Sequence, residues 1–524
     1  MTRRLFLIAA VITAFSSSCS AEPLPIRAWI LLDYRMDHIK QLIDMAAEQK
    51  INRIQLSHDL LMYASEPVDK PQLAKDINTI CDLAHAKGIK VVVWTRQLAD
   101  IPEEFNKDGK IDLTNPATWR AIQGIYEKLF AVCPGIDGVV ITTSEGSVSI
   151  GNDTKVLSDI PAADRQAKLI DTIDEVCRKH GKEIWCRSFA YMPKDLRVLQ
   201  DGIKKAKADV IAMPKCVPHD WQPFYPYSPD IGDIGNKHQI VEFDLGHEFT
   251  GNSTVPYIML GYMKRHIDHG VSKGIDGACF RVERMNWWAL GTPNQAVIDI
   301  SSRMLLNPSI DPYKEYKLWL GARYPKKAVP YLYSALVRTQ DIVEKTLFVL
   351  GQWATNHSKL PDYNYAWSHM REYKNSKWDH SGKWTEIEKY ILNPTAKTIE
   401  MIDADKDLAL KLVDASIADI EKAKPHLKAA DYSYYMDLFR REKAMVVVWK
   451  AAMDVIFGTE IYNTDKSDAN AVYLAKAADT LAKVTEDNKE HLTNMMTRSS
   501  GAKSTGNIAV ANGLVEQARK ALGK

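Results

Sequence analysis

Three carboxylates of this chain each follow a short apolar run: Glu145 within TSEG, Asp220 within PHDW and Glu248 within HEFTG. Carboxylates gathered at the C-terminal ends of several parallel strands are what barrel enzymes use for acid/base chemistry. Glu145 precedes Gly146, where the backbone can turn sharply, and a partly enclosed glutamate there could donate a proton. Taken singly, each of the three could equally cap a turn or lie in solvent.

Aromatic side chains surround two of these carboxylates in the sequence. In chain order they are Trp221, Phe224, Tyr225, Tyr227 and Phe249. Aromatic faces beside carboxylates are typical of sugar-binding sites, although the same rings could pack beneath the rim of a barrel. Together with the three carboxylates, they favour an enzyme that cleaves glycosidic bonds.

Eight apolar runs predict the strands that would position these residues. They cover residues 26–34, 51–57, 89–95, 137–143, 183–190, 209–214, 240–245 and 276–282. Continuous apolar runs suit parallel strands that are buried on both faces. Amphipathic stretches such as 36–48 and 164–180 lie between most of them and predict helices. Gly88 and Gly181 stand where a preceding helix would end.

This alternation predicts an α/β fold, a (β/α)8 TIM barrel. A doubly wound open sheet is the alternative. It is less favoured because the first strand is followed by Leu32-Asp33-Tyr34-Arg35 and not by a Gly-x-Gly-x-x-Gly turn.

A chain of 524 residues exceeds what one hydrophobic core normally serves, so two domains are expected. Past residue 305 long helical periodicity takes over, for instance at 402–423, 430–457 and 470–485. We therefore predict a catalytic barrel over 22–305 and a mostly α-helical C-terminal domain over 306–524. The net charge of +2, without a basic stripe, argues against a nucleic-acid partner.

Residues 1–21 read as a targeting segment. Arg3 and Arg4 precede eleven residues, Leu5 to Phe15, that are too few to cross a bilayer, which needs about 20. Cys19 is the expected lipidation site, and simple cleavage near Ala21 is the alternative. Either outcome predicts an exported protein, periplasmic or anchored to a bacterial membrane as a lipoprotein.

The other six cysteines show no metal-ligand spacing, so neither a metal nor another cofactor is expected. They are Cys81, Cys133, Cys177, Cys186, Cys216 and Cys279. Cys186, Cys216 and Cys279 fall on or next to predicted strands, where small buried core residues are favoured over disulfides.

Residues 136 to 320 resemble the catalytic barrel of the family-67 α-glucuronidases. The matching pieces, in order, are SEG at 144–146, WCRSFAY at 185–191, DWQ at 220–222 running on to Ser228-Pro229, VEF at 241–243, EFTG at 248–251, and NW at 286–287 followed by QA at 295–296. That family comprises inverting enzymes that remove glucuronic or 4-O-methylglucuronic acid from xylan-derived oligosaccharides. The resemblance implies that Glu145 is the general acid and that Asp220 and Glu248 flank the attacking water.

The resemblance also implies an oligosaccharide substrate from plant or algal polysaccharide with a terminal uronic acid. Arg187 and Lys215 match basic residues that the family places near the sugar and its carboxylate, although both could simply pair with strand-end acids. Two departures stand out. Ile141 occupies the position of a further family lysine, and this chain lacks room for the family's N-terminal β domain.

Further side chains at predicted strand ends are candidates to line the pocket, with a structural role as the alternative for each. The expected substrate contacts are Trp94, Arg96, Trp221, Arg281 and Trp287; Asp33, His58 and Glu283 lie at similar positions. A tryptophan cluster in the helical domain could form an aglycone platform, although helix packing is favoured for most of its members: Trp353, Trp367, Trp378 and Trp384.

Three classes of function follow from these residues. The first is an inverting exo-glycosidase for an acidic sugar. The second is a retaining glycosidase of a neutral or other sugar, with Glu145 as acid/base and Glu248 as nucleophile. The third is a glycan-binding surface lipoprotein without turnover, which the presence of all three carboxylates disfavours, because a binder needs no proton donor.

Overall fold

The computed structural model describes residues 22–143, 149–190, 192–284, 287–355, 357–372, 377–378, 383–494 and 506–523. Three residues singled out from the sequence lie outside this description. They are Cys19, Glu145 and, for its side chain, Trp287.

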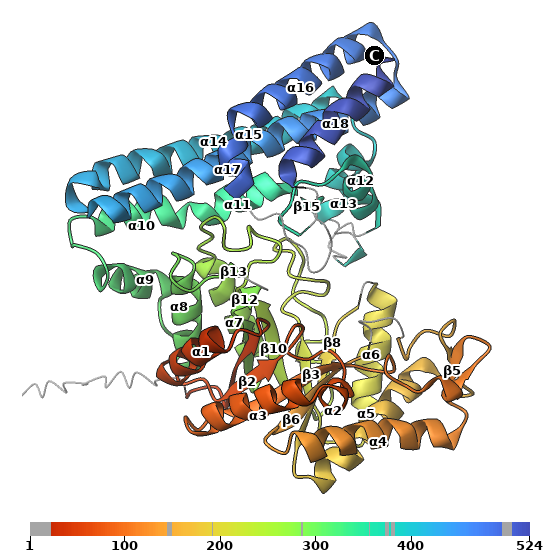
Figure 1. Cartoon of the computed structure of the whole chain (residues 1–524). Helices are drawn as coiled ribbons and strands as arrows, with labels where there is room; N and C mark the ends of the chain where they lie inside the picture. The colour runs from red at the N-terminus through yellow and green to blue at the C-terminus, as the bar shows by residue number, and fades with distance from the viewer. Residues whose placement is uncertain are drawn as a thin grey trace, which may run out of the picture.

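Eight parallel strands close into a barrel, which confirms the predicted (β/α)8 fold (Figure 1). The strands are β1 (Ile26–Leu31), β2 (Arg53–Leu56), β3 (Lys90–Arg96), β6 (Gly138–Thr142), β8 (Glu183–Ser188), β9 (Ile211–Pro214), β10 (His238–Asp244) and β11 (Gly277–Arg281). Each apolar run of the sequence contributes one of them. The barrel closes where β1 pairs with β11 on one side and with β2 on the other.

The interior of the barrel is a small apolar cluster made by alternate residues of the strands. Its members are Ala28, Ile30, Leu32, Val92, Trp94, Val140, Trp185, Met213, Ile240 and Cys279. Because successive strand residues point to opposite faces, the residue two positions after an inward-facing residue also points inward, one layer nearer the C-terminal end. Apolar strand residues that point outward, Ile141 among them, belong to the cluster that packs against the surrounding helices.

Helices cover the outside of the barrel. They are α1 (Met36–Glu48), α2 (Glu66–Asp69), α3 (Pro71–His85), α4 (Pro116–Val132), α5 (Ala162–Lys179), α6 (Pro193–Lys205), α7 (Leu260–Ser272) and α8 (Gln295–Leu306). Helices α1 and α5 lie where the periodicity predicts them. Between β9 and β10 the chain forms no helix, and residues 215–237 instead make a long loop that carries Asp220.

Several short strands form within the loops, and none of them was predicted from a continuous apolar run. A small sheet is formed by β4 (Asn106–Lys107), β5 (Lys110–Asp112) and β7 (Val156–Leu157). Two antiparallel pairs join β12 (Glu283–Arg284) to β13 (Trp287–Trp288) and β14 (Phe348–Val349) to β15 (Gln352–Trp353).

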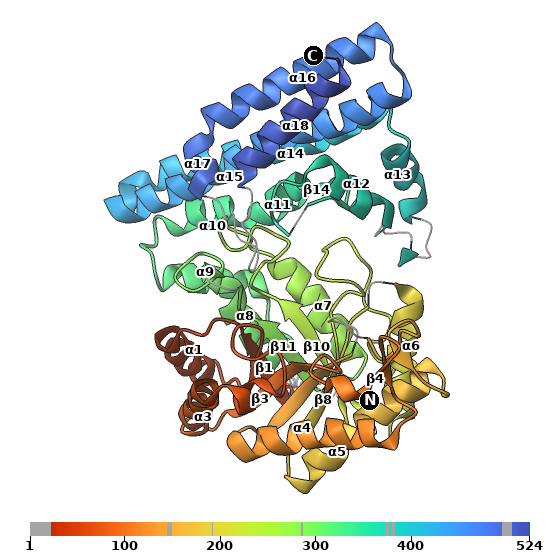
Figure 2. The same ribbon diagram turned by 45° about the vertical axis from the view of Figure 1, so that its right-hand side comes forward.

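The C-terminal region is helical, as predicted, and the long helices α14–α16 lie on one side of the barrel in both ribbon views (Figures 1 and 2). Its helices are α9 (Pro312–Gly321), α10 (Val329–Val337), α11 (Thr339–Leu347), α12 (Tyr363–Glu372), α13 (Lys383–Leu392), α14 (Ala396–Ala423), α15 (Ala429–Thr464), α16 (Asp468–Asp487), α17 (Lys489–Asn494) and α18 (Asn507–Ala521). Trp353, Trp367, Trp378 and Trp384 are all buried here, so packing accounts for them.

The helical region holds the loop that follows β10 by hydrogen bonds. Tyr257 donates its hydroxyl to Glu344 at 2.8 Å, and the amide of Ile258 donates to the hydroxyl of Thr339 at 3.0 Å. Arg441 of α15 donates to the carbonyl of Thr254 at 3.0 Å. The loop bearing Glu248 is therefore supported from both the barrel and the helices.

A buried lysine fixes the end of α11, which leads into the β14–β15 hairpin. The ammonium of Lys406 donates to the carbonyls of Lys345 at 2.5 Å, Thr346 at 2.8 Å and Phe348 at 2.7 Å. These are the carbonyls that a helix end leaves without intrahelical partners. Burial lowers the pKa of Lys406 to about 7.

The six cysteines of the described chain are free and buried, so Cys186, Cys216 and Cys279 are core residues as expected. Burial raises the pKa of the Cys216 thiol to about 12. Within the described ranges, no helix is long and apolar enough to span a membrane.

Candidate active site

Five charged side chains point into the mouth of the barrel because each lies two residues after an inward-facing core residue. Arg96 follows Trp94, Arg187 follows Trp185, Lys215 follows Met213, Glu242 follows Ile240, and Arg281 follows Cys279. The strand alternation thus sets a ring of cations at the C-terminal end of the barrel, where barrel enzymes place their sites. Carboxylates from the loops reach this ring.

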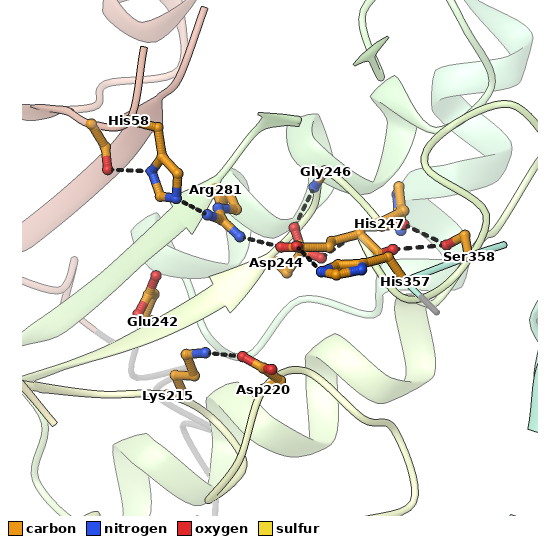
Figure 3. A network of polar contacts seen from close by, with 12 residues as sticks. His58, Lys215, Asp220, Glu242, Asp244, Gly246, His247, Arg281, His357 and Ser358 are labelled. Atoms are coloured by element: carbon orange, nitrogen blue, oxygen red, sulfur yellow. Dashed lines mark hydrogen bonds and ion pairs between the residues drawn. The ribbon is translucent and has the colours of Figure 1, made fainter. Parts of the chain in front are cut away.

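Lys215 and Asp220 form the first ion pair at this mouth (Figure 3). The Lys215 side chain is only 2% exposed. Burial alone would raise the pKa of Asp220, but the charges of Lys215 and His219 and the hydrogen bond from Lys215 outweigh it and hold this pKa well below its ordinary value. Asp220 is therefore a carboxylate throughout the neutral range and suits a base more than a proton donor.

His219 precedes Asp220 in the chain, and aromatic side chains surround its ring. Its ring is 5.8 Å from Phe189, at an interplanar angle of 18°, and 5.6 Å from Trp353. Burial lowers the pKa of His219 to about 4, so the imidazole is neutral at pH 7.

Arg187 and Glu242 form the second pair, and it is almost wholly buried. The Nε of Arg187 lies 2.6 Å from Oε2 of Glu242, with exposures of 5% and 2%. The sequence left open whether Arg187 and Lys215 meet a substrate carboxylate or pair with strand-end acids. Both make an ion pair with a carboxylate of the site, Lys215 with Asp220 and Arg187 with Glu242.

Glu248 and Arg281 form the third pair, with Nη1 of Arg281 2.6 Å from Oε2 of Glu248. Nη2 of the same guanidinium lies 3.4 Å from Nε2 of His58 (Figure 3). The His58 ring stacks on Trp94 at 4.9 Å and 9°. The contact series from Glu248 through Arg281 and His58 to Trp94 spans the mouth from β10 round to β3.

The indole ring of Trp221 lies close to the cations of all three pairs. Its ring centroid lies 4.0 Å from Nζ of Lys215, 4.6 Å from Cζ of Arg281 and 5.9 Å from Cζ of Arg187. Distances of this kind suit cation–π attraction. Since all three cations share one indole, their partner carboxylates Asp220, Glu242 and Glu248 belong to one site.

The loop after β10 presents Glu248 through a carboxylate cap. Asp244 accepts from the amide of Gly246 at 3.0 Å and from that of Glu248 at 2.7 Å. Four site residues adopt left-handed backbone conformations: His58 at φ 55°, Asp220 at φ 42°, His247 at φ 60° and His357 at φ 51°. Such conformations cost about 1–3 kcal/mol for residues with a side chain and concentrate at functional sites.

Arg96 differs from the other cations of the mouth. Its guanidinium lies 5.4 Å from the Trp94 ring, and Nη1 is 3.2 Å from the sulfur of Met62. Its Nε is buried and has no hydrogen-bond partner among the described residues. Within those residues, Arg96 also has no ion pair with a carboxylate, so it brings positive charge that the three pairs do not balance.

Glu283 and Asp33 have structural partners near the end of β1. Glu283 accepts from the amides of Leu32 and Asp33 at 2.7 and 2.9 Å, and it pairs with His38 at 2.5 Å. Asp33 pairs with Arg35 at 2.6 Å. These contacts fix the turn between β1 and α1.

Several residues of the site were given no role from the sequence. Glu242 lies in the matched VEF motif. Its position two residues after inward-facing Ile240 could have predicted that its side chain points into the barrel mouth. His357 and Ser358 contact Glu248 from the helical region, with Nε2 of His357 3.3 Å from Oε1 of Glu248. A separation of 110 residues between Ser358 and Glu248 left no local pattern to find.

No group of three or more His, Cys, Asp or Glu side chains in the described chain is arranged to hold a metal ion. What the arrangement offers is a set of buried carboxylates paired with cations, beside aromatic faces. That combination can orient water and remove a proton from it.

No protein-family model and no curated protein sequence matches this chain. Among solved structures, a GH138 enzyme targeting pectin rhamnogalacturonan II has a TM-score of 0.66 at 11% identity, over 96% of this chain and 84% of that one. CpGH84B and a mutant of the Thermobaculum terrenum O-GlcNAc hydrolase score 0.47 and 0.46 at 10% and 9% identity. They cover 95% of this chain and 77% and 94% of their own chains, and TM-scores below 0.5 do not establish a shared fold. The GH138 likeness shows a shared fold.

Proposed function

We propose that this protein is an exo-acting glycoside hydrolase that removes a terminal uronic acid from plant or algal oligosaccharides with inversion. The observation that carries the proposal is the convergence of three cation–carboxylate pairs on Trp221. A glycosidase needs carboxylates beside a sugar-binding face, and this indole with its neighbours provides both.

The roles divide by protonation state. Asp220, whose pKa lies well below its ordinary value because of Lys215 and His219, acts as a base. Glu248, in contact with Arg281 and His357, shares the positioning of the attacking water. Glu145, which follows β6 in the sequence but lies outside the described residues, supplies the proton to the leaving oxygen, as the family-67 resemblance implies.

The guanidinium of Arg96 supports an acidic sugar. Four strand cations stand at the mouth, and Arg96 is the one without an ion pair to a carboxylate among the described residues. A substrate carboxylate in reach of Arg96 would gain charge-assisted hydrogen bonds without competing against Asp220 or Glu242. By sequence, Trp287 completes the proposed sugar contacts. The predicted substrate contact Trp94 is instead a core residue, 1% exposed, that packs against Arg96 and His58.

The proposal extends to location. Residues 1–21 read as an export signal, and we propose that lipidation at Cys19 anchors the mature protein to a bacterial membrane. Export would place the enzyme where oligosaccharides from polysaccharide breakdown arrive. Labelling of the expressed protein with a radioactive fatty acid, compared with Cys19→Ala, tests the anchor directly.

A substrate panel tests the activity. The purified protein is incubated with aryl and oligosaccharide uronides, including xylan-derived and pectic oligosaccharides, and with the matching neutral glycosides. Release of a free uronic acid by the wild type, abolished in Glu248→Gln, supports the proposal. Equal hydrolysis of the neutral glycoside would contradict the acidic-sugar assignment, and release of no sugar at all would contradict the glycosidase.

A further inference from the structure

The helical region reaches the site through two consecutive residues that follow the β14–β15 hairpin. Ser358 donates to the carbonyl of Glu248 from its amide at 3.2 Å and from its hydroxyl at 2.8 Å. The same hydroxyl accepts from the amide of Gly251 at 2.7 Å (Figure 3 shows Ser358 beside this loop). Ser358 thereby holds the backbone from the Glu248 carbonyl to the Gly251 amide.

His357 contacts the carboxylate of Glu248 itself. Its Nε2 lies 3.3 Å from Oε1, while Arg281 lies 2.6 Å from Oε2, so each oxygen of Glu248 has a cationic or imidazole neighbour. The His357 ring lies 5.3 Å from Phe249 at an interplanar angle of 22°. It is 37% exposed, whereas Glu248 is 7% exposed, so His357 stands between the carboxylate and the open mouth.

His357 also acts on the other proposed base. Its charge is one of the influences that lower the pKa of Asp220, after those of Lys215 and His219. Among the described residues, the titratable groups that interact with it include Glu248, Asp220 and His369. Positive charge on His357 disfavours the imidazolium form of His369. Its backbone has φ 51°, a left-handed conformation that costs free energy and points to a specific use.

We propose that His357 is a positioning residue that fixes the Glu248 carboxylate for deprotonation of the attacking water. The inference rests on the proposed glycosidase function and adds that the helical region completes the site. With Oε2 held by Arg281 and Oε1 by His357, the carboxylate keeps one orientation. A carboxylate held in one orientation presents its oxygens to the attacking water in a fixed geometry.

The test uses the full-length protein with the best uronide from the panel. His357→Ala should lower kcat about 10- to 100-fold and leave KM within about two-fold, because orientation is lost while substrate contacts remain. His357→Gln, which keeps an N–H near the Nε2 position, should restore most of kcat. His238→Gln, on the same strand as Glu242 but at the opposite end and 58% exposed, is the matched control.

Two readouts separate positioning from mere support of the fold. The pH dependence of kcat should differ between the wild type and His357→Gln, since glutamine does not titrate. Independently of activity, the NMR titration midpoint of the His357 ring should fall in Glu248→Gln, because an anionic neighbour favours the imidazolium. Unfolding curves check that each variant is folded.

The outcomes distinguish this inference from the function on which it rests. Wild-type kcat and an unchanged pH profile in folded His357→Ala overturn the positioning role while leaving the glycosidase intact. If the wild type cleaves none of the panel, the proposed function fails, and the NMR titration still decides whether His357 and Glu248 interact. An unmoved titration midpoint in Glu248→Gln overturns the inference.

Discussion

Arg281 and Glu248 join the last barrel strand to the loop that follows β10, with 2.6 Å between Nη1 and Oε2 and little solvent on either side. The pair does two things at once. It holds a carboxylate at the mouth of the barrel, and it places a guanidinium against Trp221 at 4.6 Å.

Removing one partner of this pair should destabilise the protein. Arg281→Met leaves the Glu248 carboxylate buried beside apolar atoms, and breaking a buried pair in this way costs about 3–5 kcal/mol. The apparent Tm should fall clearly. Arg281→Met combined with Glu248→Gln should recover part of the loss, because the unpaired charge is gone. Recovery of nothing in the double variant would mean that the pair does not account for the loss.

Asp220 should keep its charge in acid solution. Its folded pKa is lowered by Lys215, so its contribution to stability is complete above the ordinary pKa of about 3.9 and is lost as pH falls through the folded value. Asp220→Asn should lower kcat about 10²- to 10⁴-fold at neutral pH, because the base is lost. The variant should also be less stable than the wild type at neutral pH, and this difference in stability should vanish only in strong acid. Thermal unfolding of both proteins between pH 7 and pH 2 measures this. A deficit that disappears already near pH 5 would contradict the assigned direction.

Glu145 should behave as the proton donor. Glu145→Gln should lower turnover of natural oligosaccharides about 10²- to 10⁴-fold, because protonation of the leaving oxygen is lost. Aryl uronides with a good leaving group should suffer much less. Kinetics on both substrate types measure the difference, and equal losses would remove Glu145 from this role.

The charge of the substrate should be sensed by Arg96 and Lys215. A charge-assisted hydrogen bond contributes about 1.5–3 kcal/mol, which corresponds to roughly 10- to 150-fold in kcat/KM. Arg96→Ala should weaken a uronide far more than the matching neutral glycoside. Lys215→Ala should show the same preference on top of a loss common to both glycosides, because it also removes the ion-pair partner of Asp220. A cation that contacts the carboxylate equally in the ground and transition states acts mainly through KM. Exposed Arg120 provides the control, Arg120→Ala. Equal losses on both glycosides would deny these cations a role in recognising charge.

The sequence predicted the barrel well because its signals are local. Each of the eight strands corresponds to a continuous apolar run in the sequence, and the helices at 36–48 and 164–180 correspond to amphipathic stretches. The inward direction of Arg187, Lys215 and Arg281 also follows from strand alternation once the register is known. Whether these cations meet a ligand or a carboxylate depends on loops, and the sequence alone left both outcomes open.

Local sequence patterns could not predict the contacts that the helical region makes with the site. His357 and Ser358 approach Glu248 only because the β14–β15 hairpin is held by packing against the barrel loops, as where Gln222 donates to the carbonyl of Gly351 at 3.1 Å. Long-range contacts of this kind depend on how two parts of a chain pack together. The tryptophans near them proved to be core residues, since packing and recognition use the same side chains.

The anomer that is formed first tests the central claim most directly. ¹H NMR during the earliest hydrolysis of an oligosaccharide uronide follows the released sugar before it mutarotates. If Asp220 and Glu248 share an attacking water while Glu145 protonates the leaving oxygen, the first product has the inverted configuration. A retained first product, or a glycosyl ester trapped on Glu248, would contradict the account and identify Glu248 as a nucleophile.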